Sequence, residues 1–454
     1  MRKKYPSGSI REALAIALPL VISNSAHMVM IFCDRMFLAN YSDLAIQAAV
    51  PAGNLAFTMI CLFTATAGYS TNLVAQYYGA DKEHQFVHAT MQGVYFILFL
   101  FPLILLTIPL GNWLIQVFGH APELAKQEEI YLAWMILSAL PVGFGWSIGG
   151  FFTGQGRVKL NTAANIIGCV FNIILDYALI FGKFGFPEMG IRGAAIATFI
   201  TGFIAPSILF YFMLRTKHVR KIGLGGAFRV DFPMMKKLVQ FGMPAGLQLF
   251  LDQGAFSFFL LCAATLDEVS LSVNNIALSI NGLAFSPLLG FGMAASILCG
   301  QYQGAGDSEN AVKSVQATMR LGFIYMAFIG AVFLLFPATL ISLIASTENS
   351  AGRSPEFLRM GRTLMYLMTA WGLFDTINIV LIGGLKGAGD TKFVMIFLSA
   401  MAWFFWIPGE LLIFLYGGGI IAAWVWLMIY VDLLAIGFWW RWRTGRWKSI
   451  KMVN

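Results

Sequence analysis

Acidic side chains occur within stretches of this chain that are otherwise almost entirely apolar. Asp34 lies near the end of one such stretch, which begins at Ile10. A carboxylate at the centre of a membrane-spanning helix costs roughly 2.5 to 3.5 kcal/mol even on biological insertion scales, so its presence needs a reason. The acids placed in this way are Asp34, Asp176, Asp252, Asp375, Glu410 and Asp432. We interpret Asp432, which precedes the segment WWRWR, as a structural residue that pairs with an arginine or reaches towards the interface.

Two of these acids have polar groups near them that could complete a cation site. Asn172 and Asp176 are four residues apart, and side chains at this spacing are neighbours on a helix. We expect Thr198 to add a hydroxyl from the next apolar stretch. Such an oxygen-rich cluster suits a hard cation, or a proton if desolvation keeps one carboxyl neutral. Alternatively Asp34 forms a salt bridge with an arginine, but the adjacent Arg35 points about 100° away on a helix.

The composition indicates an integral membrane protein. Of the 454 residues, 58% are apolar and 11% are charged, whereas an average soluble domain is about 25% charged. The five cysteines occur singly, without a CxxC pair, so neither a disulfide framework nor a metal site is indicated. The net charge of +8 does not require nucleic acid as a partner, because the distribution of Lys and Arg along the chain accounts for it.

Apolar runs long enough to cross about 30 Å of hydrocarbon as helices recur along the chain. We expect an all-α membrane protein with twelve transmembrane helices in two pseudo-symmetric six-helix bundles, because lipid excludes open sheet edges. The expected spans lie near residues 12–38, 45–76, 86–110, 129–153, 161–182, 191–214, 238–265, 272–301, 315–345, 361–385, 393–416 and 418–440. Most Lys and Arg fall at the two termini and in the even-numbered loops. This pattern predicts a multi-pass protein of the cytoplasmic membrane with both termini in the cytoplasm.

The two halves of the chain repeat one pattern. QYYGA at 76–80 matches QYQGA at 301–305, and Pro19 matches Pro244. A basic segment from 215 to 237 separates the halves. We expect an N-terminal lobe over 1–218, a cytoplasmic linker over 219–236 and a C-terminal lobe over 237–454. A cleft between two such lobes would be the substrate path, as in parallel-repeat transporters, although duplicated helices can also serve packing alone.

Prolines and one loop aspartate have local interpretations. Pro19 and Pro244 each interrupt the backbone hydrogen bonds inside a span, which makes them hinge candidates. Prolines are also tolerated in transmembrane helices that contain no moving part. We interpret Asp390, in GAGDTK, as the cap of the helix that follows it.

Several segments in order resemble the multidrug and toxic-compound extrusion (MATE) family, with features of its NorM-type branch. They are PAGLQLFLDQ (244–253), FDTINIVLIGGLKGAGDTK (374–392), NIILDYALIFG (172–182), GIRGAAIAT (190–198) and the repeated Q-Y-x-G-A. The resemblance covers essentially the whole chain. It implies a twelve-helix secondary transporter that expels organic, often cationic, compounds in exchange for Na⁺ or H⁺.

The resemblance and the repeat together assign cation or proton coupling to two sets of residues. The N-lobe set is Asp34, Asn172, Asp176 and Thr198. The C-lobe set is Asp252, Asp375, Asn378 and Glu410. The NorM-type branch looks to have a glutamate where this chain has Asp252, and the shorter side chain puts direct ligation there in doubt. Any metal bound by these sets would be Na⁺.

We therefore expect a cation-coupled antiporter that exports organic, cationic or amphiphilic compounds by alternating access. It is expected to act as a monomer in membrane lipid, without nucleotide, nucleic acid or a cofactor beyond the coupling ion. An intramembrane enzyme is one alternative, because GWSIG at 145–149 matches G-x-S-x-G, but that motif requires a strand-to-helix turn and here lies in an apolar run. No HExxH or P-loop sequence is present. A lipid-carrier flippase is the closer alternative, and it would be expected to line its cleft with arginines.

Overall fold

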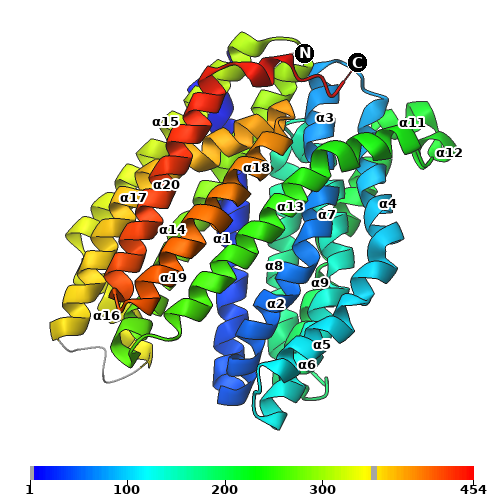
Figure 1. Cartoon of the computed structure of the whole chain (residues 1–454). Helices are drawn as coiled ribbons and strands as arrows, with labels where there is room; N and C mark the ends of the chain where they lie inside the picture. The colour runs from blue at the N-terminus through cyan, green and yellow to red at the C-terminus, as the bar shows by residue number, and fades with distance from the viewer. Residues whose placement is uncertain (1–4, 349–354, 454) are drawn as a thin grey trace. The chain divides into compact units, whose positions relative to one another are not determined.

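The computed structural model describes residues 5–348 and 355–453, and every regular element within them is a helix (Figure 1). In the first half these are α1 (Ile10–Tyr41), α2 (Asp43–Gly68), α3 (Ser70–Gly79), α4 (Gln85–Leu105), α5 (Thr107–Val117), α6 (Pro122–Leu137), α7 (Ala139–Gly154), α8 (Val158–Ile180), α9 (Gly190–Thr201), α10 (Ile204–Leu214), α11 (Lys217–Ile222) and α12 (Leu224–Ala227). In the second half they are α13 (Phe232–Ala263), α14 (Glu268–Gly304), α15 (Ser308–Leu335), α16 (Pro337–Glu348), α17 (Pro355–Ala388), α18 (Thr391–Met401), the π-helical segment η2 (Ala402–Trp406), α19 (Ile407–Leu415), α20 (Gly419–Arg443) and the 3₁₀ turn η3 (Arg446–Ser449).

Twelve helical stretches among these residues are long and apolar enough to cross a membrane. The predicted fold class, an all-α membrane protein with twelve spans, is confirmed. Some spans consist of two helices in succession, as in 43–79, where α2 is followed by α3, and 122–154, where α6 is followed by α7. The sequence pattern had indicated the spans but not these interruptions.

Proline explains two of the places where a helix stops inside the membrane. Both α4 and α6 end four residues before a proline, at Leu105 before Pro109 and at Leu137 before Pro141. Proline has no N–H, so the carbonyl four residues earlier loses its helical hydrogen bond and the helix ends there. At the second stop, Ser138 Oγ donates a hydrogen bond at 3.0 Å to the Trp134 carbonyl, which also accepts from the Ser138 N–H.

The two hinge candidates lie in a different setting. Pro19 is inside the continuous helix α1, and Pro244 is inside the continuous helix α13. Just beyond Pro19, α1 packs closely on α14, because a Cβ at Gly290 would lie only 2.8 Å from the Val21 nitrogen. The hinge role of both prolines stays a prediction.

The chain forms two compact units. Unit 1 comprises Met1–Val21, Leu251–Cys299 and Asp307–Ile450, and unit 2 comprises Ile22–Phe250, Gly300–Gly306 and Lys451–Asn454. Helices α1 and α13 therefore contribute residues to both units. The predicted lobe boundaries at 218 and 237 concern the sequence repeat, which this division does not test, and they stay a prediction.

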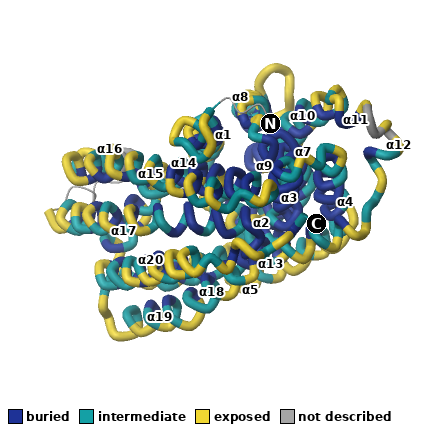
Figure 2. The backbone as a smooth tube through the Cα atoms, turned by 90° about the horizontal axis from the view of Figure 1, so that it is seen from above, coloured by how far each residue is buried: buried dark blue, intermediate teal, exposed yellow. Residues whose placement is uncertain are grey.

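Each unit has its own apolar core. In unit 2, α2 packs along α6, and α7 packs against both α3 and α4. In unit 1, α17 lies between α15 and α20, as Figure 1 shows. Figure 2 shows buried residues along α3 and α9 and many exposed residues along α16 and α19. Large apolar side chains are exposed on outer faces, such as Phe328 and Leu335 of α15, as expected for surfaces that face lipid.

The two copies of the Q-Y-x-G-A motif contact each other within unit 2. A Cβ at Gly79 would overlap the carbonyl oxygen of Gln301, and a Cβ at Gly304 would overlap the carbonyl oxygen of Gln76. Only glycine allows the ends of α3 and α14 to approach so closely. Gln301 also donates from Nε2 to the Gly154 carbonyl at 2.8 Å. The repeated motif thus specifies a reciprocal backbone contact.

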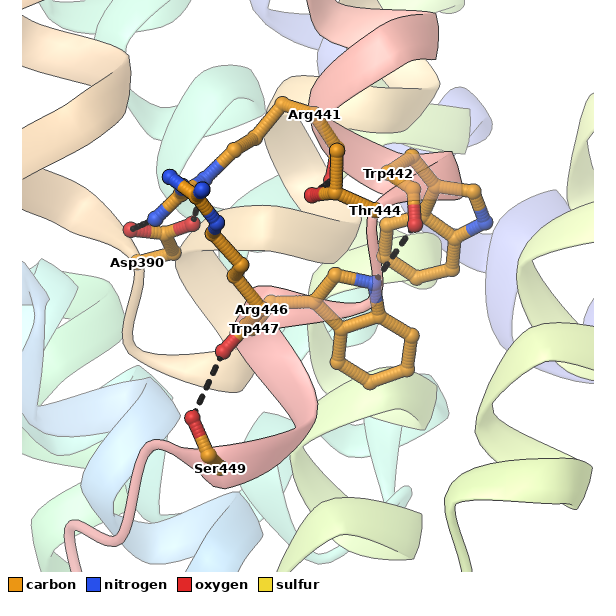
Figure 3. A network of polar contacts seen from close by, with 7 residues as sticks. All are labelled: Asp390, Arg441, Trp442, Thr444, Arg446, Trp447 and Ser449. Carbon is orange, nitrogen blue, oxygen red and sulfur yellow. Dashed lines mark hydrogen bonds and ion pairs between the residues drawn. The ribbon is translucent and has the colours of Figure 1, made fainter.

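Asp390 does not cap α18, and that prediction is wrong. Its carboxylate accepts hydrogen bonds from Arg441 Nε at 2.7 Å and from a terminal guanidinium nitrogen of Arg441 at 3.1 Å (Figure 3). Arg441 also lies over the Phe393 ring, 4.6 Å from its centroid. Both side chains are largely buried. The bidentate ion pair with Arg441 of α20 therefore takes the place of the local capping interaction. The prediction had associated arginine with Asp432 instead.

We expect Gly79→Ala to destabilise the protein by about 1–3 kcal/mol, because the added methyl group would overlap the Gln301 backbone. Thermal unfolding in detergent, followed by tryptophan fluorescence, measures the change. The matched control is Gly145→Ala, since no described atom lies within 4 Å of a Cβ at that helical position. If both variants melted at the parent temperature, the close contact at Gly79 would be refuted.

We expect Arg441→Gln to lower the free energy of unfolding by about 3–5 kcal/mol, because it leaves the buried Asp390 carboxylate without its partner. Arg443→Gln, two residues further along α20, is the comparison. Arg443 is exposed and stacks on Trp439 at 4.7 Å, which is worth only about 0.5–1 kcal/mol. Chemical unfolding of both variants in detergent would show the difference, and equal losses would contradict the assigned ion pair.

Candidate functional site

The predicted N-lobe residues meet within unit 2, where α1, α6, α8 and α9 contribute polar side chains. Asp176 is 0% exposed and lies one helical turn after Asn172, which is 1% exposed. Asp34 of α1 lies close enough to Asp176 for the two carboxylates to interact electrostatically. The structure therefore brings together three of the four residues that sequence reasoning assigned to this set.

Hydrogen bonds fix the orientation of the Asn172 amide. Its Nδ2 donates to Thr201 Oγ1 at 3.1 Å, and Thr201 Oγ1 in turn donates to the Ala197 carbonyl at 2.7 Å. The hydroxyl beside Asn172 thus belongs to Thr201, which sequence reasoning missed. Thr198 lies one turn earlier, half-buried, and its carbonyl accepts from the Gly202 N–H at 3.0 Å. The role assigned to Thr198 stays a prediction.

Several oxygen atoms of this cluster are buried and accept no hydrogen bond from the residues that the structure describes. They are both carboxylate oxygens of Asp176, Oδ1 of Asp34 and Oδ1 of Asn172. Carboxylate and amide oxygens are ligands for hard cations, and the same carboxylates can take up a proton. In the described part of the chain, no group of three or more His, Cys, Asp or Glu has the arrangement of a metal site. Carboxylate and amide oxygens suit a hard cation or a proton better than a soft transition metal.

Two further residues border the Asp34–Asp176 pair. Tyr131 of α6 is buried and interacts electrostatically with both carboxylates, and sequence reasoning missed it. A tyrosine inside an apolar helix is a weak signal, because its ring also suits ordinary packing. Arg35 is exposed, and none of the ion pairs among the described residues joins it to Asp34. The salt-bridge alternative for Asp34 is therefore not supported.

The predicted C-lobe acids Asp252 and Asp375 meet within unit 1. Both interact electrostatically with Tyr430 of α20. Asn378 is a hydrogen-bond partner of Asp375 and also donates from Nδ2 to the Val431 carbonyl at 3.0 Å. Asn378 thus shares the surroundings of Asp375, as its spacing of three residues suggested.

A lysine accompanies these acids. Lys386 of α17 interacts electrostatically with Asp252, and sequence reasoning missed it. Its spacing could have indicated this position. Lys386 follows Asp375 by eleven residues, which is about three turns of helix, so the two side chains lie on the same face. The cluster in unit 1 therefore includes a basic side chain, whereas the cation near the unit 2 pair is the exposed Arg35.

Glu410 lies beside this cluster, in the first turn of α19, and is 1% exposed. Trp406 Nε1 donates to its Oε1 at 2.9 Å, and the Trp406 ring stacks on Tyr430 with centroids 5.2 Å apart. Trp406 ends the π-helical segment η2, and such segments are frequent at functional sites. Trp406 and Tyr430 therefore connect Glu410 to the surroundings of Asp252 and Asp375.

Known proteins resemble this chain over most of its length. The family model MatE matches two segments, 19–178 and 244–412, one in each half of the chain. "Probable multidrug resistance protein NorM" of Thermotoga maritima is 26% identical over 452 residues, covering 97% of this chain and 93% of the relative. The protein of the same name from Mesorhizobium japonicum is 26% identical over 444 residues, covering 95% of this chain and 93% of the relative.

Solved structures share the fold. A crystal structure of MATE in complex with MaL6 superimposes with a TM-score of 0.85 at 20% identity, over 98% of both chains. An outward-facing multidrug resistance MATE family transporter gives a TM-score of 0.86 at 18% identity, also over 98% of both chains. A superfamily transporter from Pyrococcus furiosus, described as having a binding pocket of reverse polarity and a different function, gives 0.85 at 19% identity over 98% of both chains. At these identities the likeness shows the fold alone.

We expect Thr201→Val to destabilise the protein by about 1–3 kcal/mol, because it removes the acceptor of the buried Asn172 amide. Thr198→Val, one turn away at a half-buried position, should cost less. Chemical unfolding of both variants in detergent measures the difference. A larger loss for Thr198→Val than for Thr201→Val would show that the wrong hydroxyl has been assigned to Asn172.

Proposed function

The chain belongs to the MatE family, and from that membership we propose that it exports organic, cationic or amphiphilic compounds in exchange for Na⁺ or H⁺. Export would proceed across the cytoplasmic membrane by alternating access, in a protein that acts as a monomer. The names of the curated relatives, which describe multidrug resistance proteins, support the substrate class. The basic segment between 215 and 237 supports cytoplasmic termini.

The Asp34–Asp176 pair is the observation on which this proposal rests. Two carboxylates within electrostatic range, with buried oxygens that accept no hydrogen bond from described residues, are costly in an apolar environment. A cation or proton that binds there removes much of that cost. If it binds one conformational state better than the other, it shifts the equilibrium between states by its difference in affinity. Substrate that prefers the opposite state is then exchanged for the cation.

The two acid clusters would have different roles in this scheme. The unit 2 cluster offers mainly oxygen acceptors, which favours it as the principal site of the coupling ion, through Asp34, Asn172 and Asp176. In the unit 1 cluster, Lys386 already interacts with Asp252. An arriving cation would have to compete with that lysine, so we assign this cluster a supporting role in coupling or in substrate recognition.

A lipid-carrier flippase remains the second candidate. The fold does not decide between the two, because a structure described as having a different function shares it equally well. The acids of both clusters favour export of cations over that alternative. A flippase that carries lipid-linked phosphates would need basic groups facing its substrate. Lys386 lies beside Asp252, and the other basic group found next to a predicted site acid is the exposed Arg35.

We expect Asp34→Asn to abolish gradient-driven export, because the amide keeps the size of the side chain but cannot take up a cation or a proton in the same way. Proteoliposomes that contain the purified protein, with imposed Na⁺ or pH gradients and ethidium as the transported cation, provide the measurement. Asp43→Asn is the matched control, since Asp43 is an exposed acid at the start of the next helix, α2.

The control should transport at the parent rate. Gradient-driven transport by Asp34→Asn at that same rate would refute the coupling role of Asp34. Failure of the parent protein to move ethidium or another organic cation under either gradient would refute the proposed function itself.

A further inference from the structure

A histidine and a glutamate form a close contact at the start of α6. His120 Nδ1 lies 2.8 Å from Glu128 Oε2. The His120 side chain is 36% exposed, whereas that of Glu128 is 2% exposed. The pair therefore connects a solvent-accessible group to a buried carboxylate. The ring of Phe118 stacks on His120, with centroids 6.2 Å apart.

Glu128 shares a buried face of α6 with Tyr131, which borders the Asp34–Asp176 pair. Tyr131 is three residues further on, so both side chains are buried on one face of this helix, about 4.5 Å apart along its axis. Tyr131 interacts electrostatically with Asp34 and with Asp176. The second oxygen of Glu128, Oε1, is buried and accepts no hydrogen bond from the described residues. The ionisable side chains of His120, Glu128 and Tyr131 thus form a series that leads from solvent to the acid pair.

The neighbouring helices carry few other ionisable groups that could exchange protons with this series of side chains. Of the helices packed against α6, α5 and α7 have no ionisable side chain, and α4 has His88 and Tyr95, whose hydroxyl donates to the Phe228 carbonyl. Helix α2 contributes the exposed Asp43 and the buried thiol of Cys61, which donates to the Thr58 carbonyl, and α9 contributes the exposed Arg192. On α6 itself Glu123 and Lys126 are exposed, and Glu129 accepts a hydrogen bond from Gln116 of α5 at 3.2 Å.

We propose that His120 and Glu128 form a proton relay between the outer surface and the Asp34–Asp176 pair. This inference rests on the proposed function and makes it more specific, because it names the proton as the coupling ion. An imidazole nitrogen is a common proton carrier near neutral pH, whereas Na⁺ prefers oxygen ligands. On the proposed orientation, the segment 118–121 lies outside the membrane, where the proton would enter.

The transfer needs no additional reactant. A protonated His120 gives its Nδ1 proton to Glu128 Oε2, which leaves a neutral imidazole and a carboxylic acid. The Glu128 acid then releases a proton towards Asp34 or Asp176, through the Tyr131 hydroxyl or water, and becomes a carboxylate again. His120 is reprotonated from the outer solution, so each proton that arrives restores the starting state of the relay.

The test compares the rate of pH-driven ethidium export in proteoliposomes for the parent, Glu128→Gln and His120→Asn. We expect Glu128→Gln to slow export by about tenfold or more, since it removes the buried proton carrier. His120→Asn should slow export mainly when the outer solution is near neutral pH, because direct protonation of Glu128 from solution becomes sufficient at acidic pH. Equilibrium binding of ethidium, measured by fluorescence anisotropy, should stay at the parent value in both variants.

Two controls separate this relay from other effects. Glu123→Gln changes an exposed acid in the first turn of α6 and should export at the parent rate. Glu128→Asp keeps the carboxyl group and should restore part of the rate lost in Glu128→Gln, which a purely structural role would not require. Because His120 is partly exposed, its variant is expected to fold even if changes at the buried Glu128 reduce the yield of protein.

Parent-like export by Glu128→Gln, or by His120→Asn at every outer pH, would overturn the relay. So would export by the parent that follows an imposed Na⁺ gradient and ignores a pH gradient. In each of these cases, loss of export in Asp34→Asn would still support the proposed antiporter. A parent protein that moves no organic cation at all would instead refute the proposed function.

Discussion

Burial of ionisable oxygen atoms in an apolar environment is the constraint on which the rest of this structure depends. Asp176 is completely buried, and its carboxylate accepts no hydrogen bond from the described residues. Such a group is tolerated only where protein, water or a bound cation surrounds it, because hydrocarbon offers no compensation. This requirement turns the polar faces of α1, α6, α8 and α9 towards one another within unit 2. The positions of Tyr131 and Thr201 follow from the same requirement.

The same physics governs the backbone. A peptide group inside a bilayer must find a hydrogen-bond partner within the protein, so a helix can be interrupted only where the lost bonds are compensated. At the stop after Leu137, Pro141 removes one helical hydrogen bond, while the Ser138 hydroxyl finds an acceptor within the protein, the carbonyl of Trp134. The π-helical segment before Glu410 is a second irregularity, and Trp406 at its end donates to that buried acid. Irregular backbone and buried polar groups therefore occur together.

The spans and the acids could be predicted from the sequence because their signals are local. Hydropathy over about twenty residues identifies a span, and a carboxylate within that span is conspicuous because of its cost. Thr201 and Tyr131 could not be identified in this way, since their roles depend on which helix each one faces. Asp390 shows the limit of local rules: its sequence context predicted a cap, but Arg441, far along the chain, binds its carboxylate. Which helices pack together decides such cases, and local sequence patterns do not show that packing.

The two acid clusters show how a duplicated sequence can diverge in its electrostatics while the fold persists. In unit 2, the buried amide Asn172 directs its nitrogen to Thr201 and leaves its oxygen beside the acids, which adds to the negative potential there. In unit 1, Asn378 donates to Val431 and is a hydrogen-bond partner of Asp375, while Lys386 interacts with Asp252 and Trp406 donates to Glu410. Buried oxygens without a hydrogen bond from described residues occur in both clusters, but a lysine accompanies the acids in unit 1 alone of the two. A cation is stabilised most where negative charge is not already compensated, so Lys386 beside Asp252, more than the number of acids, distinguishes the two clusters.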